Sequence, residues 1–128
     1  MNNKKIKSAI FPVAGMGTRF FPATKASPKE MLPIIDKPLI QYAVEEALDA
    51  DIENLIFITS SDKISIKNHF NKSYKIEVEL EKRNKIKELE LIKNILPKNI
   101  NCNYITQDQT LGLGHAVLCA KSVVGDNP

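Results

Sequence analysis

The chain has 128 residues, a length that suits a single domain. Its composition of 43% hydrophobic and 26% charged residues is typical of a globular protein and excludes an intrinsically disordered one. The formal net charge of +3 is too small to indicate a nucleic-acid partner. The first apolar run, broken at Pro12 and Gly15, is too short for a secretion signal or a membrane span, so we expect a cytoplasmic protein without a membrane partner.

The first half of the chain predicts two strands separated by a long loop and a helix. The first strand covers residues 6–13, which are largely apolar. Residues 14–35 are punctuated by prolines, and a loop this long inside a compact domain usually has a function. Residues 36–38 predict a helix start, because proline suits an early helical position and apolar residues then recur at helical spacing up to Leu48. The apolar run at residues 55–59 is typical of a central parallel strand buried on both faces.

The second half continues the alternation of helices and strands. Residues 60–62 contain Ser and Asp side chains that suit the N-cap of a following helix. Residues 73–96 form a charged helical stretch, which we interpret as a surface helix or helix pair, with a partner-binding or oligomerisation helix as the alternative. A third strand is predicted over residues 103–107 and a last helix over residues 115–121. The inward-facing residues of this last helix are predicted to be Ala116, Val117 and Ala120. Short connections between alternating strands and helices predict an open α/β sheet.

The cysteines and histidines do not form a recognisable metal or nucleophile motif. Cys102 and Cys119 lie outside any CxxC pair, so the sequence does not indicate a zinc site. We expect reduced, partly buried thiols, with a disulfide between them as the alternative. His69 is predicted on a surface helix. His115 stands near a helix start, where a structural hydrogen bond is favoured over an acid–base role.

A glycine-containing turn, Val13-Ala14-Gly15-Met16-Gly17-Thr18-Arg19, follows the first predicted strand. Glycine lets the backbone approach a ligand, and free N–H groups beside cations are suited to binding a polyphosphate. The P-loop pattern is absent, and the dinucleotide pattern is incomplete because Phe20 occupies the position of its third glycine. A lone Gly-x-Gly is weak evidence, since it also suits an ordinary turn between a strand and a helix.

The turn gains specificity from the motifs that follow it. These are Phe21-Pro-Ala-Thr-Lys25, Pro28-Lys-Glu-Met-Leu-Pro33, Asp36-Lys-Pro-Leu-Ile-Gln-Tyr42, Gly112-Leu-Gly-His-Ala-Val117 and Val123-Val-Gly-Asp126. Together they resemble the sugar-phosphate nucleotidyltransferase family, and its uridylyl branch more than its thymidylyl branch. The resemblance covers nearly all of this chain, but only about the first half of the family's catalytic domain.

The resemblance implies a fold and an activity. The fold is α/β, with a Rossmann-like, open, mostly parallel sheet and flanking helices. Residues 1–128 would be the N-terminal nucleotide-binding part of a truncated transferase domain, with a charged helical insertion at about residues 73–96. The activity is uridylyl transfer from UTP to glucose 1-phosphate by in-line attack on the α-phosphate, which gives UDP-glucose and pyrophosphate. The alternatives are thymidylyl transfer to the same sugar phosphate and a catalytically inactive nucleotide-binding or interaction fragment.

The resemblance also implies which residues would bind the phosphates. Arg19 would offer its planar fork of donors to the β and γ oxygens, and Lys29 a point charge to the α-phosphate. Backbone N–H groups would cradle phosphate at Gly15, Met16, Gly17 and Thr18. Lys25 and Glu30 are expected only to support the loop. Arg19 and Lys29, taken singly, are equally well explained as solvated surface cations.

Uracil contacts are implied for the backbone of Ala14 and Gly15, for the side chain of Gln107 and for Gly112. A glutamine amide both donates and accepts, which fits the mixed edge of the base. The family usually has glycine at the position after this glutamine, where the present chain has Asp108. Mg²⁺ is implied as cofactor, with its ligands beyond Pro128, so no metal ligand is assigned here and Asp126 is not one. A homo-oligomer is expected for the full-length protein.

Overall fold

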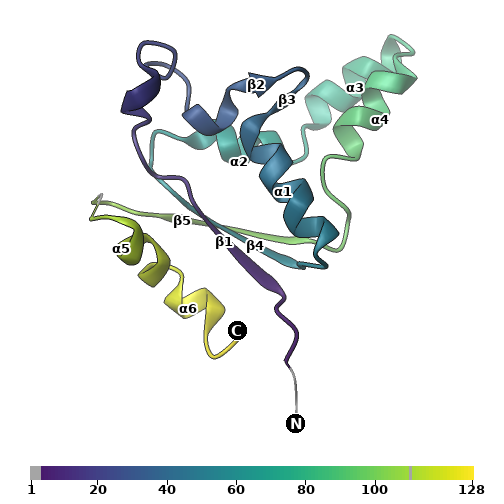
Figure 1. Ribbon diagram of the computed structural model, residues 1–128. Helices are drawn as coiled ribbons and strands as arrows, with labels where there is room; N and C mark the ends of the chain where they lie inside the picture. The colour runs from purple at the N-terminus through teal and green to yellow at the C-terminus, as the bar shows by residue number, and fades with distance from the viewer. Residues whose placement is uncertain (1–3, 110) are drawn as a thin grey trace.

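A three-stranded parallel sheet forms the centre of the protein (Figure 1). The computed structural model describes residues 4–109 and 111–128. The strands are β1 (Ser8–Pro12), β4 (Asn54–Thr59) and β5 (Asn101–Thr106), and β4 lies between the other two and runs parallel to both. The apolar run at residues 55–59 is therefore the central strand, as predicted.

One face of the sheet is covered by α1 (Leu39–Asp49) and α2 (Ile64–Phe70). Leu55 and Phe57 point to this face, and both are fully buried. The ring of Phe57 stacks on the rings of Phe11, Phe70 and Tyr104 with centroid distances of 5.1, 5.4 and 5.2 Å. Aromatic pairs at this separation add to the free energy gained from burial alone.

The opposite face is covered by two short helices, α5 (Leu113–Leu118) and α6 (Lys121–Val124) (Figure 1). Ile56 and Ile58, the alternate residues of β4, pack there with Ala116 and Ala120. Helices on both faces explain why residues 55–58 of β4 are all apolar. The α/β fold with a parallel sheet and flanking helices is thus confirmed.

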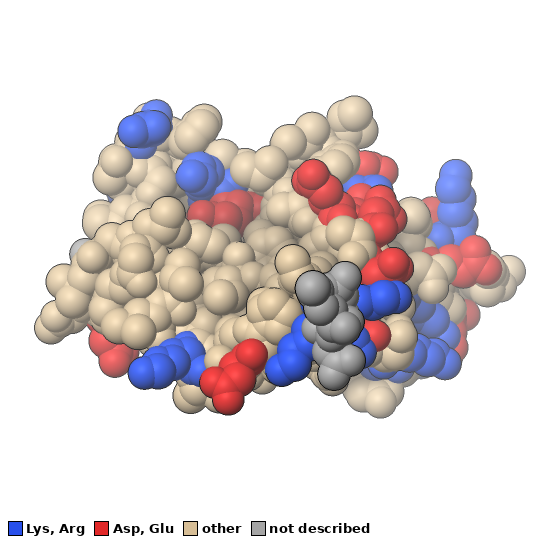
Figure 2. Space-filling view, turned by 60° about the horizontal axis from the view of Figure 1, so that its bottom comes forward, with Lys and Arg blue, Asp and Glu red and all other residues tan. Residues whose placement is uncertain are grey.

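The last predicted helix is two helices in the structure, because the chain turns between Leu118 and Lys121. Ala116 and Ala120 face inward as predicted, but Val117 is 46% exposed, so its inward assignment was wrong. Figure 2 shows a broad uncharged area in its left half, with Lys, Arg, Asp and Glu around its border and in greater number on the right. Helices of the described part of the chain are all too short or too polar to cross a membrane.

The segment between β1 and α1 contains two short 3-10 helices and a small hairpin. The 3-10 helices are η1 (Thr18–Phe20) and η2 (Lys29–Met31). The hairpin pairs β2 (Pro33–Ile34) with β3 (Lys37–Pro38). A helix start at residues 36–38 was therefore wrong: Pro38 is extended, with φ −66° and ψ 149°, and α1 begins at Leu39. The restricted φ of proline suits both positions, which is why the sequence did not separate them.

The predicted cap of α2 also differs from the structure. The Ser60 hydroxyl donates to the Asp62 carboxylate, a bond that lowers the pKa of Asp62, and neither side chain caps the helix. Lys63 occupies the N-cap position instead, without a side-chain capping bond. The side chains at residues 60–62 therefore stabilise a local turn that precedes the helix.

The charged stretch at residues 73–96 contains a pair of helices, α3 (Tyr74–Lys82) and α4 (Ile86–Lys93). The chain reverses between them with Asn84 at φ 53°, a left-handed conformation that asparagine tolerates. Leu89 is the buried apolar residue of α4, at 7% exposure. The interpretation of this stretch as a helix pair on the surface is therefore confirmed.

Candidate functional site

The carboxyl ends of the three parallel strands meet at one edge of the sheet. Hydrogen bonds continue the strand pairing one residue further there: Val13 N–H donates to the Ile58 carbonyl at 2.9 Å, and Gln107 N–H to the Thr59 carbonyl at 2.7 Å. The glycine-containing turn and Gln107, which are distant in sequence, therefore flank the end of β4. In open α/β sheets this edge is where ligands bind.

Gly17 is the glycine that the turn requires. Its φ of +67° is left-handed, and a Cβ atom there would lie 3.2 Å from Lys29 Cβ and 3.3 Å from Thr24 Cγ2. The hydroxyl of Thr24 donates to the Gly17 carbonyl at 2.7 Å, which closes the loop on itself. Gly15 differs, because a Cβ atom there would meet nothing within 4 Å. Gly17 shapes the turn, whereas Gly15 leaves its outer side open to a ligand.

The backbone of the turn offers unused donors. Within residues 4–109 and 111–128, the N–H groups of residues 15–18 donate to no protein acceptor. The first hydrogen bonds after them are made by Phe20 N–H to the Gly17 carbonyl, at 3.1 Å, and by Phe21 N–H to the Thr18 carbonyl, at 3.2 Å. Met16 is 71% exposed at the tip of the turn. Consecutive free N–H groups in a turn are suited to binding an anion.

Two cations stand next to these donors. Arg19 lies in η1 and is exposed, and Lys29 lies in η2 and is half-buried. Neither forms an ion pair with any residue that the structure describes. The packing of Gly17 against the stem of Lys29 brings the two cations to one loop. Both charges are therefore available to an anionic ligand at the turn.

A buried ion pair anchors this loop to the sheet. Lys63 Nζ lies 3.0 Å from Glu30 Oε2, and the two side chains are only 6% and 12% exposed. The same Nζ donates to the Val13 carbonyl. Lys63 thus joins the start of α2 to η2 and to the beginning of the glycine turn. Sequence analysis gave Glu30 a supporting role, which this contact bears out, but it missed Lys63.

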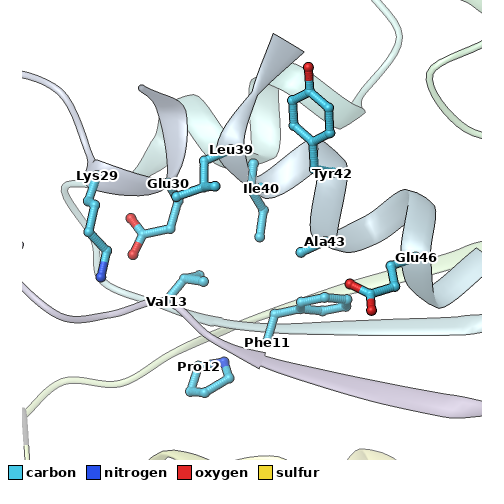
Figure 3. Close-up of a pocket in the computed structure, with 10 residues that line it drawn as sticks. All are labelled: Phe11, Pro12, Val13, Lys29, Glu30, Leu39, Ile40, Tyr42, Ala43 and Glu46. Carbon is cyan, nitrogen blue, oxygen red and sulfur yellow. The ribbon is translucent and has the colours of Figure 1, made fainter. Parts of the chain in front are cut away.

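A cleft of about 450 Å³ opens between the end of β1, η2 and α1 (Figure 3). In Figure 3, Lys29 and Glu30 point from η2 towards Val13 on one side of the cleft, and α1 forms the other side. Its lining is mostly apolar and consists of Phe11, Pro12, Val13, Lys29, Glu30, Leu39, Ile40, Tyr42, Ala43 and Glu46. The Lys29 ammonium is therefore reachable from solvent along this cleft.

On the other side of β4, Gln107 contacts His115. The glutamine is 6% exposed, and its Nε2 lies 2.8 Å from His115 Nδ1. Gly112 precedes α5 with φ +96°, and its carbonyl accepts from Ala116 N–H at 3.1 Å. The structural hydrogen bond predicted for His115 is confirmed, and its partner is the glutamine to which the resemblance assigns the base. Asp108 is exposed and follows Gln107 directly.

His69 belongs to a hydrogen-bond network and does not lie freely on the surface. It is half-buried, and its Nε2 lies 2.7 Å from Gln41 Oε1. Gln41 in turn donates to Glu45, which also accepts from Lys37 at 2.9 Å. Burial lowers the pKa of His69, and the hydrogen bond between Lys37 and Glu45 raises the pKa of the lysine and lowers that of the carboxyl group. The network ties β3, α1 and α2 together next to the cleft.

The remaining sulfur and acidic groups do not assemble into a metal site. Cys102 and Cys119 are both free and half-buried, as predicted, and burial raises the pKa of the Cys102 thiol. Among residues 4–109 and 111–128, no group of three or more His, Cys, Asp or Glu side chains could hold a metal ion. The carboxyl edge of the described chain offers backbone donors, two cations and the Gln107 amide.

Comparison with known proteins decides the family. The sequence pattern of the family described as nucleotidyl transferase matches residues 8–128, which include the glycine turn, both cations and Gln107. The chain belongs to this nucleotidyl transferase family. Among curated members, the UTP–glucose-1-phosphate uridylyltransferase of Escherichia coli K12 is 52% identical over 126 residues, which are 98% of this chain and 42% of that protein.

Solved structures agree with this assignment. A UDP-glucose pyrophosphorylase from Acinetobacter baumannii superposes with a TM-score of 0.93 at 50% identity, over 95% of this chain and 43% of that one. A UTP-bound pyrophosphorylase from the same organism also gives a TM-score of 0.93, at 49% identity. The chain therefore has the fold of this nucleotidyl transferase family and spans about 42% of the length of the curated relatives it matches.

Proposed function

We propose that this chain is the nucleotide-binding part of an enzyme that transfers a uridylyl group from UTP to glucose 1-phosphate. The observation that carries the proposal is the carboxyl edge, where the open N–H groups of residues 15–18 lie beside two unpaired cations and across the end of β4 from Gln107. The names of relatives at 52% identity, and the UTP-bound structure at 49%, support the choice of substrate.

The phosphates of UTP would lie on the glycine turn. Its N–H groups would donate to phosphate oxygens, and the guanidinium of Arg19 would bind the β and γ oxygens through parallel hydrogen bonds. Gly17 keeps this surface in place, since any other residue there would push against Thr24 and Lys29. The site thus neutralises part of the triphosphate charge before the reaction starts.

The reaction would be an in-line displacement at the α-phosphorus. An oxygen of glucose 1-phosphate forms the new bond to this phosphorus while the bond to the bridging oxygen breaks, so pyrophosphate leaves with the electron pair. Negative charge on the α-phosphate oxygens must be stabilised throughout, and Lys29 is the cation we assign to it. The buried Glu30–Lys63 pair would position Lys29, because it fixes the neighbouring residue of η2.

Uracil would lie between the backbone of Ala14 and Gly15 on one side and Gln107 and Gly112 on the other. Val13 and Gln107 both hydrogen-bond to β4, so the strand holds the two sides at a fixed separation. Gly112 has φ +96° and no Cβ atom, which lets a planar base approach the backbone. This arrangement gives the base a donor and acceptor edge together with a flat surface.

The cofactor, the cellular location and the oligomeric state of the enzyme are also part of this proposal. Mg²⁺ remains an expectation of the family resemblance, with its ligands beyond Pro128, and the described residues offer no ligand set that fits it. A cytoplasmic location is supported by the two free thiols, which suit a reducing compartment. The limits of the nucleotide-binding part, at residues 1–128 with a helical insertion at about 73–96, and a homo-oligomeric enzyme stay predictions.

The first test is calorimetric titration of the chain with UTP and dTTP. We expect UTP to bind, and Arg19→Ala and Lys29→Ala each to weaken binding about tenfold or more, because each removes a charge-assisted contact. Lys98→Ala, at an exposed position outside the site, is the matched control and should bind like the parent. Equal affinity in all four proteins would contradict the site, and tighter binding of dTTP would favour thymidylyl transfer.

Turnover is tested in a chimera in which residues 8–128 replace the matching segment of the Escherichia coli relative. We expect UDP-glucose to form, and Lys29→Ala to remove most of the rate while the chimera stays folded, because Lys29 stabilises charge that develops in the transition state. A folded chimera without activity would support the inactive-fragment alternative. Near-normal turnover of the Lys29→Ala chimera would remove the catalytic assignment.

A further inference from the structure

The contact between Gln107 and His115 bears on how the side-chain amide of Gln107 is oriented. Nε2 of Gln107 lies 2.8 Å from Nδ1 of His115. An amide nitrogen donates only, so Nδ1 accepts, and the ring proton of the neutral imidazole resides on its other nitrogen. With the ring proton on Nε2, the contact distinguishes the two ends of the glutamine amide, because a reversed amide would point its carbonyl oxygen at the unprotonated Nδ1 and would require the other ring tautomer.

We infer that His115 determines base specificity by holding the amide of Gln107 in the orientation that reads uracil and rejects cytosine. The inference rests on the proposed function, in which Gln107 contacts the base. His115 is a positioning residue here: it touches the glutamine and acts on the nucleotide through it.

The surroundings of the pair limit other ways of orienting the amide. Gln107 is only 6% exposed, and its backbone N–H is bound to the Thr59 carbonyl at 2.7 Å. Among the residues that the structure describes, His115 is the side chain that hydrogen-bonds to the glutamine amide. His115 is itself fixed in α5, where its carbonyl accepts from Cys119 N–H at 3.0 Å. The imidazole therefore approaches the amide from a defined direction.

The chemistry of the bases explains why the orientation matters. With one N–H given to His115, the amide retains its carbonyl oxygen and a second N–H. Uracil presents an N3–H donor between two carbonyl acceptors, which complements an oxygen and an N–H side by side. Cytosine presents an N3 acceptor beside an amino donor, so it would face the carbonyl oxygen with a lone pair. Only the reversed amide complements cytosine.

A purely structural role for the contact makes a different prediction. If the bond only anchored α5 to the end of β5, its loss would lower stability and weaken the binding of all nucleotides alike. If the bond orients the amide, its loss changes the ratio of affinities for UTP and CTP. The ratio is therefore the decisive readout, since it is unaffected by a uniform loss of binding.

The test measures dissociation constants for UTP and CTP by calorimetry on the parent chain and three variants, with thermal melting to confirm folding. His115→Asp keeps an acceptor, His115→Leu removes it, and His115→Lys replaces it with a donor. The parent should favour UTP by about tenfold or more, because a mismatched base leaves buried polar groups unpaired. His115→Asp should keep this ratio within about threefold, His115→Leu should bring it near one, and His115→Lys should favour CTP.

Each outcome supports or contradicts the inference. A parent ratio retained by both His115→Leu and His115→Lys overturns it, while leaving the proposed function intact if Gln107→Leu loses the preference. A parent that binds neither nucleotide, or both equally, contradicts the proposed function and the inference with it. A variant that does not fold is replaced by His115→Gln, whose amide can present either end and which is expected to lower the preference.

Discussion

The two sides of the site are built differently. We call residues 13–31 together with Lys63 the phosphate side, and Gln107 together with residues 112–120 the base side. The phosphate side contains a buried ion pair, a required glycine and a threonine that closes the turn, and it rests on the larger apolar cluster. The base side rests on the smaller cluster, to which α5 and the turn before α6 contribute mainly Ala116 and Ala120, and on one hydrogen bond between side chains.

Because of this difference, we expect substitutions on the two sides to affect different properties, either the stability of the fold or the choice of base. Substitutions of Glu30, Lys63 or Gly17 on the phosphate side break contacts that also stabilise the fold, because the ion pair is buried and the backbone at the glycine is constrained. Substitutions on the base side remove few contacts, so they should alter which base is bound more than whether the chain folds. The four predictions that follow test the comparison, and they are ordered from the largest expected effect to the smallest.

Lys63→Ala should have the largest effect. It leaves Glu30 and the Val13 carbonyl buried without their partner, and breaking a buried pair in this way costs about 3–5 kcal/mol in the free energy of unfolding. Urea denaturation measures this loss in the free energy of unfolding, with Lys87→Ala at an exposed position of α4 as the control. The double variant Glu30→Met with Lys63→Met should recover part of the loss, because no unpaired charge remains. A loss below about 1 kcal/mol in Lys63→Ala would show that the pair is not an anchor.

Gly17→Ala should destabilise the chain by about 1–2 kcal/mol, since alanine is strained at φ +67° and its methyl group would press on Lys29 and Thr24. UTP affinity should fall as well, because the turn must shift. Gly15→Ala is the matched control, because a Cβ atom there would have no neighbour within 4 Å. Its free energy of unfolding should therefore change by less than about 0.5 kcal/mol. Equal effects at both glycines would contradict the distinction between a shaping and an open position.

His69 should make stability depend on pH. Burial lowers its pKa below the ordinary value of 6.5, so the unfolded chain binds a proton more readily than the folded one. Its contribution to stability is present above pH 6.5 and is lost as the pH falls through the lowered folded pKa. Melting temperatures between pH 7.5 and 5.0 should therefore fall less in His69→Gln than in the parent. An unchanged slope in this variant would contradict the assignment.

Arg83→Ala tests the most exposed ion pair among the residues that the structure describes, and it should have the smallest effect. Nε of Arg83 lies 2.8 Å from Oε1 of Glu79 in the helix pair at residues 73–96, but the two side chains are 69% and 53% exposed. Solvent screening limits such a pair to about 0.3–0.5 kcal/mol. Urea denaturation at low and high salt should show little difference between variant and parent. A loss comparable to that of Lys63→Ala would erase the contrast between buried and surface charge.

Much of the fold could be predicted because its signals are local. The apolar run at residues 55–59 identified a central strand, since only helices on both faces explain it. Glutamate and arginine four residues apart in a charged stretch identified a surface helix. The hairpin ending in Lys37–Pro38 was missed because strands of two residues have no periodicity.

The site was less predictable where it depends on distant contacts. Lys63 carries no motif, and its partner lies 33 positions earlier in the chain, so no spacing rule connects them. The hydrogen bond of His69 was missed for the same reason, because Gln41 is 28 positions away. His115 was assigned a structural hydrogen bond correctly, but the identity of its partner needed the fold. Arg19, Lys29 and the other residues taken from the resemblance await the binding experiments.

The packing around Gly17 has a consequence for protein engineering. Thr24 and Lys29 supply the wall against which this glycine fits, and the Thr24 hydroxyl closes the loop by bonding to its carbonyl at 2.7 Å. A graft of residues 13–19 alone onto another scaffold would carry the glycine motif without the contacts of Thr24 and Lys29. The turn would then be free to adopt many conformations. The transplantable unit is the closed segment from Val13 to Lys29, so a search for this turn in unrelated proteins should require all three positions together.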